Sequence, residues 1–208
     1  MAVFTKVSEK EIKQHLKTYS IGNLISFEGI LEGIENTNYK ITTDKNSYGL
    51  TIFEKRVNPE DLPFFMNLQK ELVTKKFDCP LPIKNNNNLI INNLKNKNAV
   101  IISFLKGEKV KKILPLHCNE VGSMISRFTN ITKSFKLSRQ NSMGYDTWVS
   151  IYDKCKKVDD PAYIKYFEVL DEELFFLKNN WPNNLPKAII HADLFKDNIF
   201  FTNNKISG

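Results

Sequence analysis

The sequence predicts an α+β protein with an antiparallel sheet in its first half and a mostly helical second half. Between residues 24 and 105, short β-branched and aromatic runs alternate with Asn- and Gly-containing turns. From residue 106 onward, apolar residues recur at helical spacing over longer stretches. Of the 208 residues, 41% are apolar and 25% are charged, which is the composition of a globular chain. We therefore expect two parts, at residues 1–105 and 106–208.

A helix and a three-stranded meander are expected first. Ser8 and Glu11 have the spacing of a capping box, and apolar residues at helical spacing continue to residue 19. The β-prone runs that follow are separated by turns with Gly, Asn and Asp. We expect three antiparallel strands, at residues 24–30, 39–43 and 48–53.

A second helix and a hairpin complete the first half. Asn58 is a suitable N-cap and Pro59 suits the first helical position, after which apolar residues continue to about residue 76. The Cys-Pro-Leu-Pro stretch at 79–82 interrupts regular structure. We expect a hairpin with strands at 89–92 and 99–105.

The second half predicts three helices, at residues 116–129, 145–155 and 162–179, the last capped by Asp160 with Pro161 at its first position. Short strands are expected at 188–191 and 199–202, and a further strand begins at residue 205. The sequence stops two residues into that strand, which would leave backbone groups unpaired. We therefore expect the helical part to be incomplete at its C-terminus.

Composition also excludes several classes of function. The net charge is +7, but only three of the thirty basic residues are Arg, the residue that reads guanine and clamps phosphate bidentately. A basic nucleic-acid-binding module is therefore the less favoured alternative. The three cysteines show no disulfide or zinc spacing. No apolar run approaches the ~20 residues of a membrane span, and the N-terminus has no signal-peptide pattern. We expect a cytoplasmic protein without membrane or nucleic-acid partners.

The segment 190–201 carries the sharpest chemical pattern. Its skeleton is H-x-D-L-x-x-x-N between two predicted strands, as in the catalytic loop of eukaryotic-like kinases. Asp193 can accept the proton of a substrate hydroxyl, and Asn198 can offer an amide oxygen to Mg²⁺. His191 supports the loop by hydrogen bonding. Asp197 lies one residue off the Asn position and is left out of the catalytic set.

The segment 32–39 lies between the first two predicted strands, where a loop covering a nucleotide is expected. It contains no Walker A or G-x-G-x-x-G pattern, so by itself it is also typical of an ordinary turn. Backbone N–H groups near Gly33 and the small polar side chains of Asn36 and Thr37 can hold phosphates there.

Together these segments resemble the bacterial homoserine kinases of the aminoglycoside phosphotransferase/choline kinase-like superfamily. The resemblance covers Glu-Gly-Ile-Glu-Asn-Thr-Asn-Tyr at 32–39, Phe-Glu-Lys-Arg-Val at 53–57 and Asp-Leu-Pro-Phe-Phe at 61–65. It extends to Leu-Lys-Gly at 105–107, Arg-Gln-Asn at 139–141 and the loop at 191–198. It implies a protein-kinase-like fold with two lobes. It also implies ATP and Mg²⁺ as cofactors, and phosphorylation of homoserine in threonine biosynthesis.

The resemblance also assigns roles to individual residues. Asp193 matches the catalytic Asp and Asn198 the metal-binding Asn. Residues 103–105 fall at the hinge between the lobes, where backbone groups of Ser103 and Leu105 would bind adenine. The expected cofactor-binding residues are Gly33, Asn36, Thr37, Lys55, Ser103 and Leu105.

Two positions depart from the superfamily pattern. Thr51 stands where a Lys or Arg of the third strand is usual, and Lys55, on the same strand face, is the substitute that we expect. The second metal-binding Asp, expected after residue 206, is absent from this sequence, so we expect this polypeptide alone to be inactive.

The substrate assignment leaves alternatives open. Arg139 and Asn141 are the expected substrate contacts, with Arg139 pairing with the homoserine carboxylate. An ordinary surface ion pair for Arg139 fits the sequence equally well. A kinase for choline, ethanolamine or an aminoglycoside would share the fold. The oligomeric state is not predicted.

Overall fold

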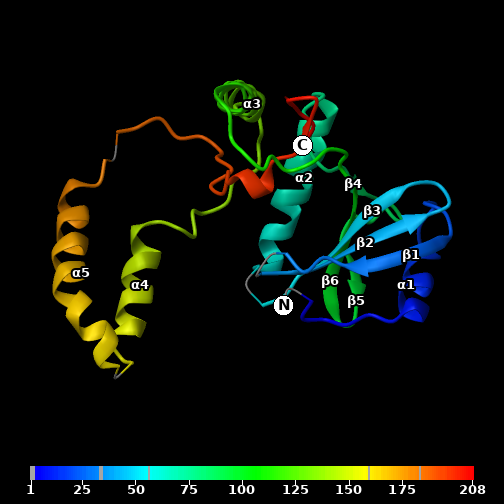
Figure 1. Ribbon diagram of the computed structural model, residues 1–208. Coiled ribbons are helices and arrows are strands. Elements are labelled where there is room, and N and C mark those ends of the chain that lie inside the picture. The colour runs from blue at the N-terminus through cyan, green and yellow to red at the C-terminus, as the bar shows by residue number, and fades with distance from the viewer. Residues whose placement is uncertain (1–2, 33–34, 56, 159, 183) are drawn as a thin grey trace. The chain divides into compact units, whose positions relative to one another are not determined.

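Figure 1 shows the computed structural model, which describes residues 3–32, 35–55, 57–158, 160–182 and 184–208. The chain divides into two compact units, one of residues 1–137 with 188–208, the other of residues 138–187. The lobe boundary at residue 105 does not coincide with this division and stays a prediction.

The first unit is built on a six-stranded antiparallel sheet. Its order is β1-β2-β3-β6-β4, and β5 pairs with the same edge of β6 as β4 does. The predicted meander is confirmed as β1 (Leu24–Gly29), β2 (Thr37–Thr43) and β3 (Ser47–Ile52). A hairpin is present as β5 (Asn92–Leu94) and β6 (Lys97–Ser103), with a tight turn at Lys95 and Asn96, which both have positive φ. The strand predicted at 89–92 is misplaced, because residues 89–91 are not in a strand and β5 begins at Asn92.

The short strand β4 (Pro82–Ile83) was not expected from the Pro-rich stretch 79–82. It pairs with Ile101 and Ile102 of β6. Proline has no N–H to give to a ladder, which restricts it to edge strands such as this one. Leu81 extends the pairing because its carbonyl accepts from the Ser103 N–H at 2.8 Å, and its own N–H donates to the Ser103 hydroxyl at 2.9 Å.

The hydrophobic core lies between one face of the sheet and α1 (Glu9–Leu16), which has the predicted Ser8–Glu11 capping box. Inward residues of β2 and β3 alternate with outward ones, and Ile41, Leu50 and Ile52 are fully buried. Ile12 of α1 packs into the same cluster. The other face of the sheet carries Asn38, Lys40 and Thr51 and is more polar.

Two further helices belong to the first unit. α2 (Leu62–Thr74) follows a 3-10 turn at Pro59–Asp61, where the Asn58 side chain accepts from the Glu60 N–H. α3 (Pro115–Thr132) packs against the residues after α2 through the aromatic pair Phe77–Phe128, and Phe135, just after α3, packs on Phe64 of α2. Arg127 adds a hydrogen bond to the Lys76 carbonyl.

The C-terminal strands β7 (Phe201–Thr202) and β8 (Lys205–Ile206) form the predicted hairpin. The prediction of a strand at 188–191 is wrong, because this segment has no strand partner among the described residues and Ile190 is 73% exposed. A short apolar run becomes a strand only when a neighbour completes its ladder.

The second unit contains α4 (Tyr145–Cys155) and α5 (Pro161–Asn180), which match the predicted helices closely and lie side by side in Figure 1. Asp160 caps α5 by accepting from the Ala162 N–H. Tyr152 packs its ring on Phe167, and Trp148 packs on Trp181. Within the described residues, no helix is sufficiently long and apolar to cross a membrane.

Candidate active site

The loop at 191–198 brings Asp193 and Asn198 into direct contact. The Asn198 amide donates to the Asp193 carboxylate Oδ2 at 2.7 Å and to the Asp193 backbone carbonyl at 2.8 Å. A 3-10 turn at Lys196–Asn198 returns the chain toward Asp193. Both side chains are exposed, so the Asp193 carboxylate is accessible to a substrate hydroxyl.

The backbone before Asp193 has an unusual conformation. Ala192 has φ +65°, in the left-handed region that costs most side chains about 1 kcal/mol or more. The Asp193 N–H donates to Nδ1 of His191 at 3.3 Å, so His191 supports the loop as predicted. Strained backbone held by local hydrogen bonds is a common way to present a reactive side chain.

The donor atoms of this loop fit Mg²⁺. Both amide hydrogen bonds of Asn198 use Nδ2, which leaves Oδ1 as an oxygen donor beside the Asp193 carboxylate. Within the described ranges, no group of three or more His, Cys, Asp or Glu residues forms a metal cluster. Magnesium typically takes one or two protein oxygens together with substrate phosphates and water, so a sparse donor set suits it.

The predicted hinge follows β6. Ser103 is still part of the sheet and pairs with Leu81 through both its backbone and its hydroxyl. At Leu105 the chain has left the sheet, and in the described part of the protein its backbone N–H and carbonyl make no hydrogen bond. These two groups are thus available to an adenine edge.

The polar face of the sheet extends from the end of β6, next to the predicted hinge, along β3. Gly49 of β3 lies opposite Ile102, and a Cβ at residue 49 would be 3.1 Å from the Ile102 side chain. Further along β3, the Thr51 hydroxyl donates to Asn38 on the neighbouring strand at 2.8 Å. Thr51 therefore stabilises the pairing of β2 and β3 at the position where the superfamily usually has a basic residue.

The loop between β1 and β2 is described only in part, and Gly33 lies outside the described residues. The Asn36 side-chain oxygen accepts from the Glu54 N–H at 3.2 Å, which connects the end of this loop to the end of β3. Thr37 is fully buried, and its hydroxyl accepts from the N–H groups of Phe4 and Thr5. A phosphate contact at Thr37 would therefore have to use its backbone. Lys55, next to Glu54, is exposed.

Sequence analysis missed a charged cluster beside these residues. Glu54 accepts from the hydroxyls of Thr5 and Thr37 at 2.7 Å each and forms an ion pair with Lys97. Burial alone would raise the pKa of Glu54. The hydrogen bonds from Lys97, Thr5 and Thr37, with the charge of Lys97, outweigh burial and hold the pKa below its ordinary value. No local motif indicates this cluster, because its members come from four separate segments.

The predicted substrate contacts lie in the second unit. Arg139 donates to the Ser142 hydroxyl at 3.2 Å, and the Asn141 side chain accepts from the Met143 N–H at 2.9 Å. Both residues precede α4. Their role toward a substrate stays a prediction.

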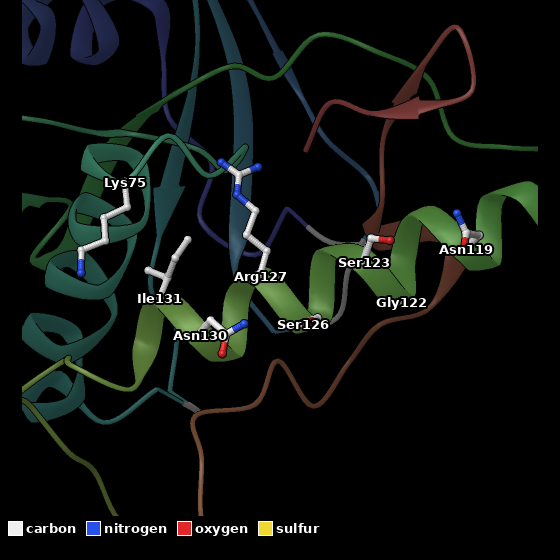
Figure 2. A pocket seen from close by; sticks show the side chains of 8 residues that line it. All are labelled: Lys75, Asn119, Gly122, Ser123, Ser126, Arg127, Asn130 and Ile131. Carbon is white, nitrogen blue, oxygen red and sulfur yellow. The ribbon is translucent and has the colours of Figure 1, made fainter.

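A separate open depression runs along α3, as Figure 2 shows. Its lining is Asn119, Gly122, Ser123, Ser126, Arg127, Asn130 and Ile131 of α3 with Lys75 beyond the end of α2. None of the predicted site residues lies in it. The Lys75 ammonium is already paired with Glu71 at 3.2 Å and with the Ser134 hydroxyl.

Comparison with protein families decides the kind of protein. The family model described as "Phosphotransferase enzyme family" matches residues 26–208. The chain belongs to this family. The predicted protein-kinase-like fold is confirmed, because this chain resembles an amicoumacin kinase solved with AMP-PNP, Ca²⁺ and Ami. The TM-score is 0.74 at 15% identity, over 96% of this chain and 62% of that one. A spectinomycin phosphotransferase solved with ADP and its antibiotic gives a TM-score of 0.65 at 11% identity, over 96% and 67% of the two chains.

Curated relatives of this chain are named homoserine kinase. Those of Bartonella henselae and Parvibaculum lavamentivorans are each 41% identical over all 208 residues, and that of Agrobacterium fabrum is 38% identical. The chain spans 65% of the length of each of these three relatives.

Proposed function

We propose that the protein containing this chain is a homoserine kinase, which transfers the γ-phosphoryl group of ATP to the hydroxyl of L-homoserine in threonine biosynthesis. The observation that carries the proposal is the Asp193–Asn198 contact on an exposed loop, in a chain similar along its whole length to homoserine kinases. A cytoplasmic location, with small molecules as the only ligands, is part of this proposal.

The proposed chemistry follows from the groups on the two sides of the nucleotide. The homoserine oxygen attacks the γ-phosphorus, the bond to the β–γ bridging oxygen breaks, and the hydroxyl proton passes to the Asp193 carboxylate. Asn198, through Oδ1, would hold Mg²⁺, which when bound neutralises charge on the phosphates. The backbone of Leu105 binds adenine, while Lys55 and the loop ending at Asn36 contact the phosphates.

Homoserine is distinguished from other amino alcohols by its carboxylate. We propose that Arg139 pairs bidentately with that carboxylate and that Asn141 contributes a polar contact. A kinase for choline, ethanolamine or an aminoglycoside remains the alternative, because the proposed phosphoryl-transfer groups do not themselves select the acceptor.

A panel of substrates tests the proposal on the protein encoded by the longest reading frame that contains this sequence. ADP production is measured with homoserine, choline, ethanolamine and kanamycin. We expect turnover with homoserine and little with the others. Equal turnover of choline and homoserine would defeat the assignment, since choline offers no carboxylate to Arg139.

The variant Arg139→Lys tests the substrate contact in the same assay. Losing the planar guanidinium should raise the KM for homoserine and leave the KM for ATP unchanged, because the bidentate contact supplies ground-state binding. Arg127→Lys, the same change on α3, is the matched control and should leave the homoserine KM unchanged.

A further inference from the structure

The Glu54 cluster, which consists of Thr5, Thr37, Glu54 and Lys97, joins four segments at one carboxylate. The Glu54 side chain is only 11% exposed, yet three side chains donate to it. The Lys97 ammonium also contacts the Thr5 hydroxyl at 2.7 Å, so the members are bonded to one another as well as to Glu54. Removing one member of such a network leaves buried polar groups without partners.

The cluster is continuous with the elements that face the nucleotide. The Glu54 backbone N–H donates to Asn36, so Glu54 is bound to the end of the β1–β2 loop by main chain as well as side chain. Thr37 directly follows Asn36, and Lys55 directly follows Glu54. A further bond attaches the N-terminal segment to β2, because the Tyr39 hydroxyl donates to the Thr5 carbonyl at 2.9 Å.

Strand register locates the cluster relative to the hinge. Tyr48 pairs with Ser103 at the hinge end of the sheet, and Ile52 pairs with Ala99 four residues away. At about 3.3 Å per residue, these pairs are about 13 Å apart. Glu54 and Lys97 lie beyond the second pair, at the end of the sheet away from the hinge. We place the adenine at Leu105 and let the nucleotide extend along the polar face of the sheet. Its phosphates then lie toward this end.

We propose that Glu54 is a positioning residue for the nucleotide phosphates: through Thr37, Lys97 and Thr5 it holds the end of β3 and the end of the β1–β2 loop, and so fixes Lys55 and Asn36. Glu54 does not itself contact the nucleotide. This inference rests on the proposed function in taking ATP as the ligand, with adenine at Leu105 and the phosphates at Lys55 and Asn36, and it does not depend on the acceptor.

The experiment uses the protein encoded by the longest reading frame that contains this sequence. Calorimetry measures the binding of AMP-PNP in the presence of Mg²⁺, and steady-state kinetics at varied ATP give the KM for ATP. Glu54→Gln should weaken AMP-PNP binding and raise the KM for ATP by about tenfold, the size expected for loss of hydrogen bonds to a charged group. The KM for homoserine should stay unchanged. Glu9→Gln, which removes an exposed ion pair with Lys13 on α1, is the matched control.

A second pair of variants separates positioning from stability. In Glu54→Gln combined with Lys97→Met, no unpaired charge remains, so the melting temperature should recover partly while AMP-PNP binding stays weak. Thr5→Val, which keeps the side-chain shape, provides a milder change if Glu54→Gln does not fold. It should weaken AMP-PNP binding by a smaller factor.

The outcomes distinguish this inference from the proposed function. AMP-PNP affinity within twofold of wild type in both Glu54→Gln and Thr5→Val would overturn the positioning role, even if homoserine kinase activity is found. Affinity that recovers together with the melting temperature in the double variant would also overturn it. A wild-type protein that binds AMP-PNP but phosphorylates no homoserine would defeat the proposed function and leave the positioning role intact. No AMP-PNP binding by the wild type would defeat both.

Discussion

The end of β3 and the loop at 191–198 each present a carboxylate, and the two are held in opposite ways. Glu54 is nearly buried and accepts hydrogen bonds from segments that are far apart in the sequence. Asp193 is exposed, and within the described part of the protein its side chain and backbone N–H bond to Asn198 and His191 of its own loop. A carboxylate whose oxygens already accept several hydrogen bonds can orient its neighbours but has few lone pairs left for a substrate. An exposed carboxylate on a locally stabilised turn can accept a proton from a substrate.

The contrast separates the proposed positioning residue, Glu54, from the proposed catalytic residue, Asp193. Substitution at Asp193 should change the rate of the chemical step with little effect on folding. Substitution in the Glu54 cluster should change nucleotide binding and stability. Three further measurements test this separation, beginning with the largest effect.

Asp193→Asn should reduce kcat by roughly 10²–10⁴, because the amide retains the shape but cannot accept the hydroxyl proton. The melting temperature and the KM for ATP should change little. Steady-state kinetics and thermal denaturation of the protein encoded by the longest reading frame check both points. Asp197→Asn, an exposed neighbour in the same loop, is the control and should keep nearly wild-type activity. Comparable losses in the two variants would remove the special role of Asp193.

Ile41→Ala should lower the free energy of unfolding by about 2–5 kcal/mol, the usual result of truncating a fully buried aliphatic side chain. Ile25→Ala on the adjacent strand β1 removes the same atoms from a side chain that is 67% exposed, and should stay within about 0.5 kcal/mol of wild type. Urea denaturation gives both values. Similar losses would mean that the burial of Ile41 and the exposure of Ile25 do not differ as described.

The pH dependence of stability gives the smallest effect. The pKa of Glu54 is lowered from 4.5 in the folded protein, so its ionised form stabilises the fold above pH 4.5. That contribution is lost as the pH falls through the lowered folded pKa. The difference in melting temperature between wild type and Glu54→Gln should therefore be largest near neutral pH and shrink progressively in acid. A difference that is constant between pH 7 and pH 3 would contradict the ionised cluster.

Features encoded by short-range patterns were predictable from the sequence. The capping box at Ser8, the proline at the start of α5 and the alternation along β2 and β3 each indicate one element within a few residues. The Asp193–Asn198 contact belongs to the same class, because one loop contains both residues and their spacing is set by a single turn.

Features that depend on pairing between distant segments were not predictable. Residues 188–191 have the composition of a strand but pair with no strand in the described ranges, while Pro82 enters the sheet at its edge because β6 offers a ladder there. The Glu54 cluster is the clearest case. Glu54 and Lys97 occur in a lysine-rich sequence where many acid–base pairs are equally plausible, and only the β3–β6 register selects this one.

The bridge between Glu108 and Phe201 has a consequence for local unfolding. Each residue donates its N–H to the other's carbonyl at 2.9 Å, and the Ser207 hydroxyl adds a bond to the Lys106 carbonyl. The segment after Leu105 and the hairpin following Asn198 are thus hydrogen-bonded to each other. Because both bridge amides lose protection when either strand separates, they exchange with solvent in the same opening event. Fluctuations that loosen the chain after Leu105 are therefore expected to loosen the hairpin that follows Asn198 as well.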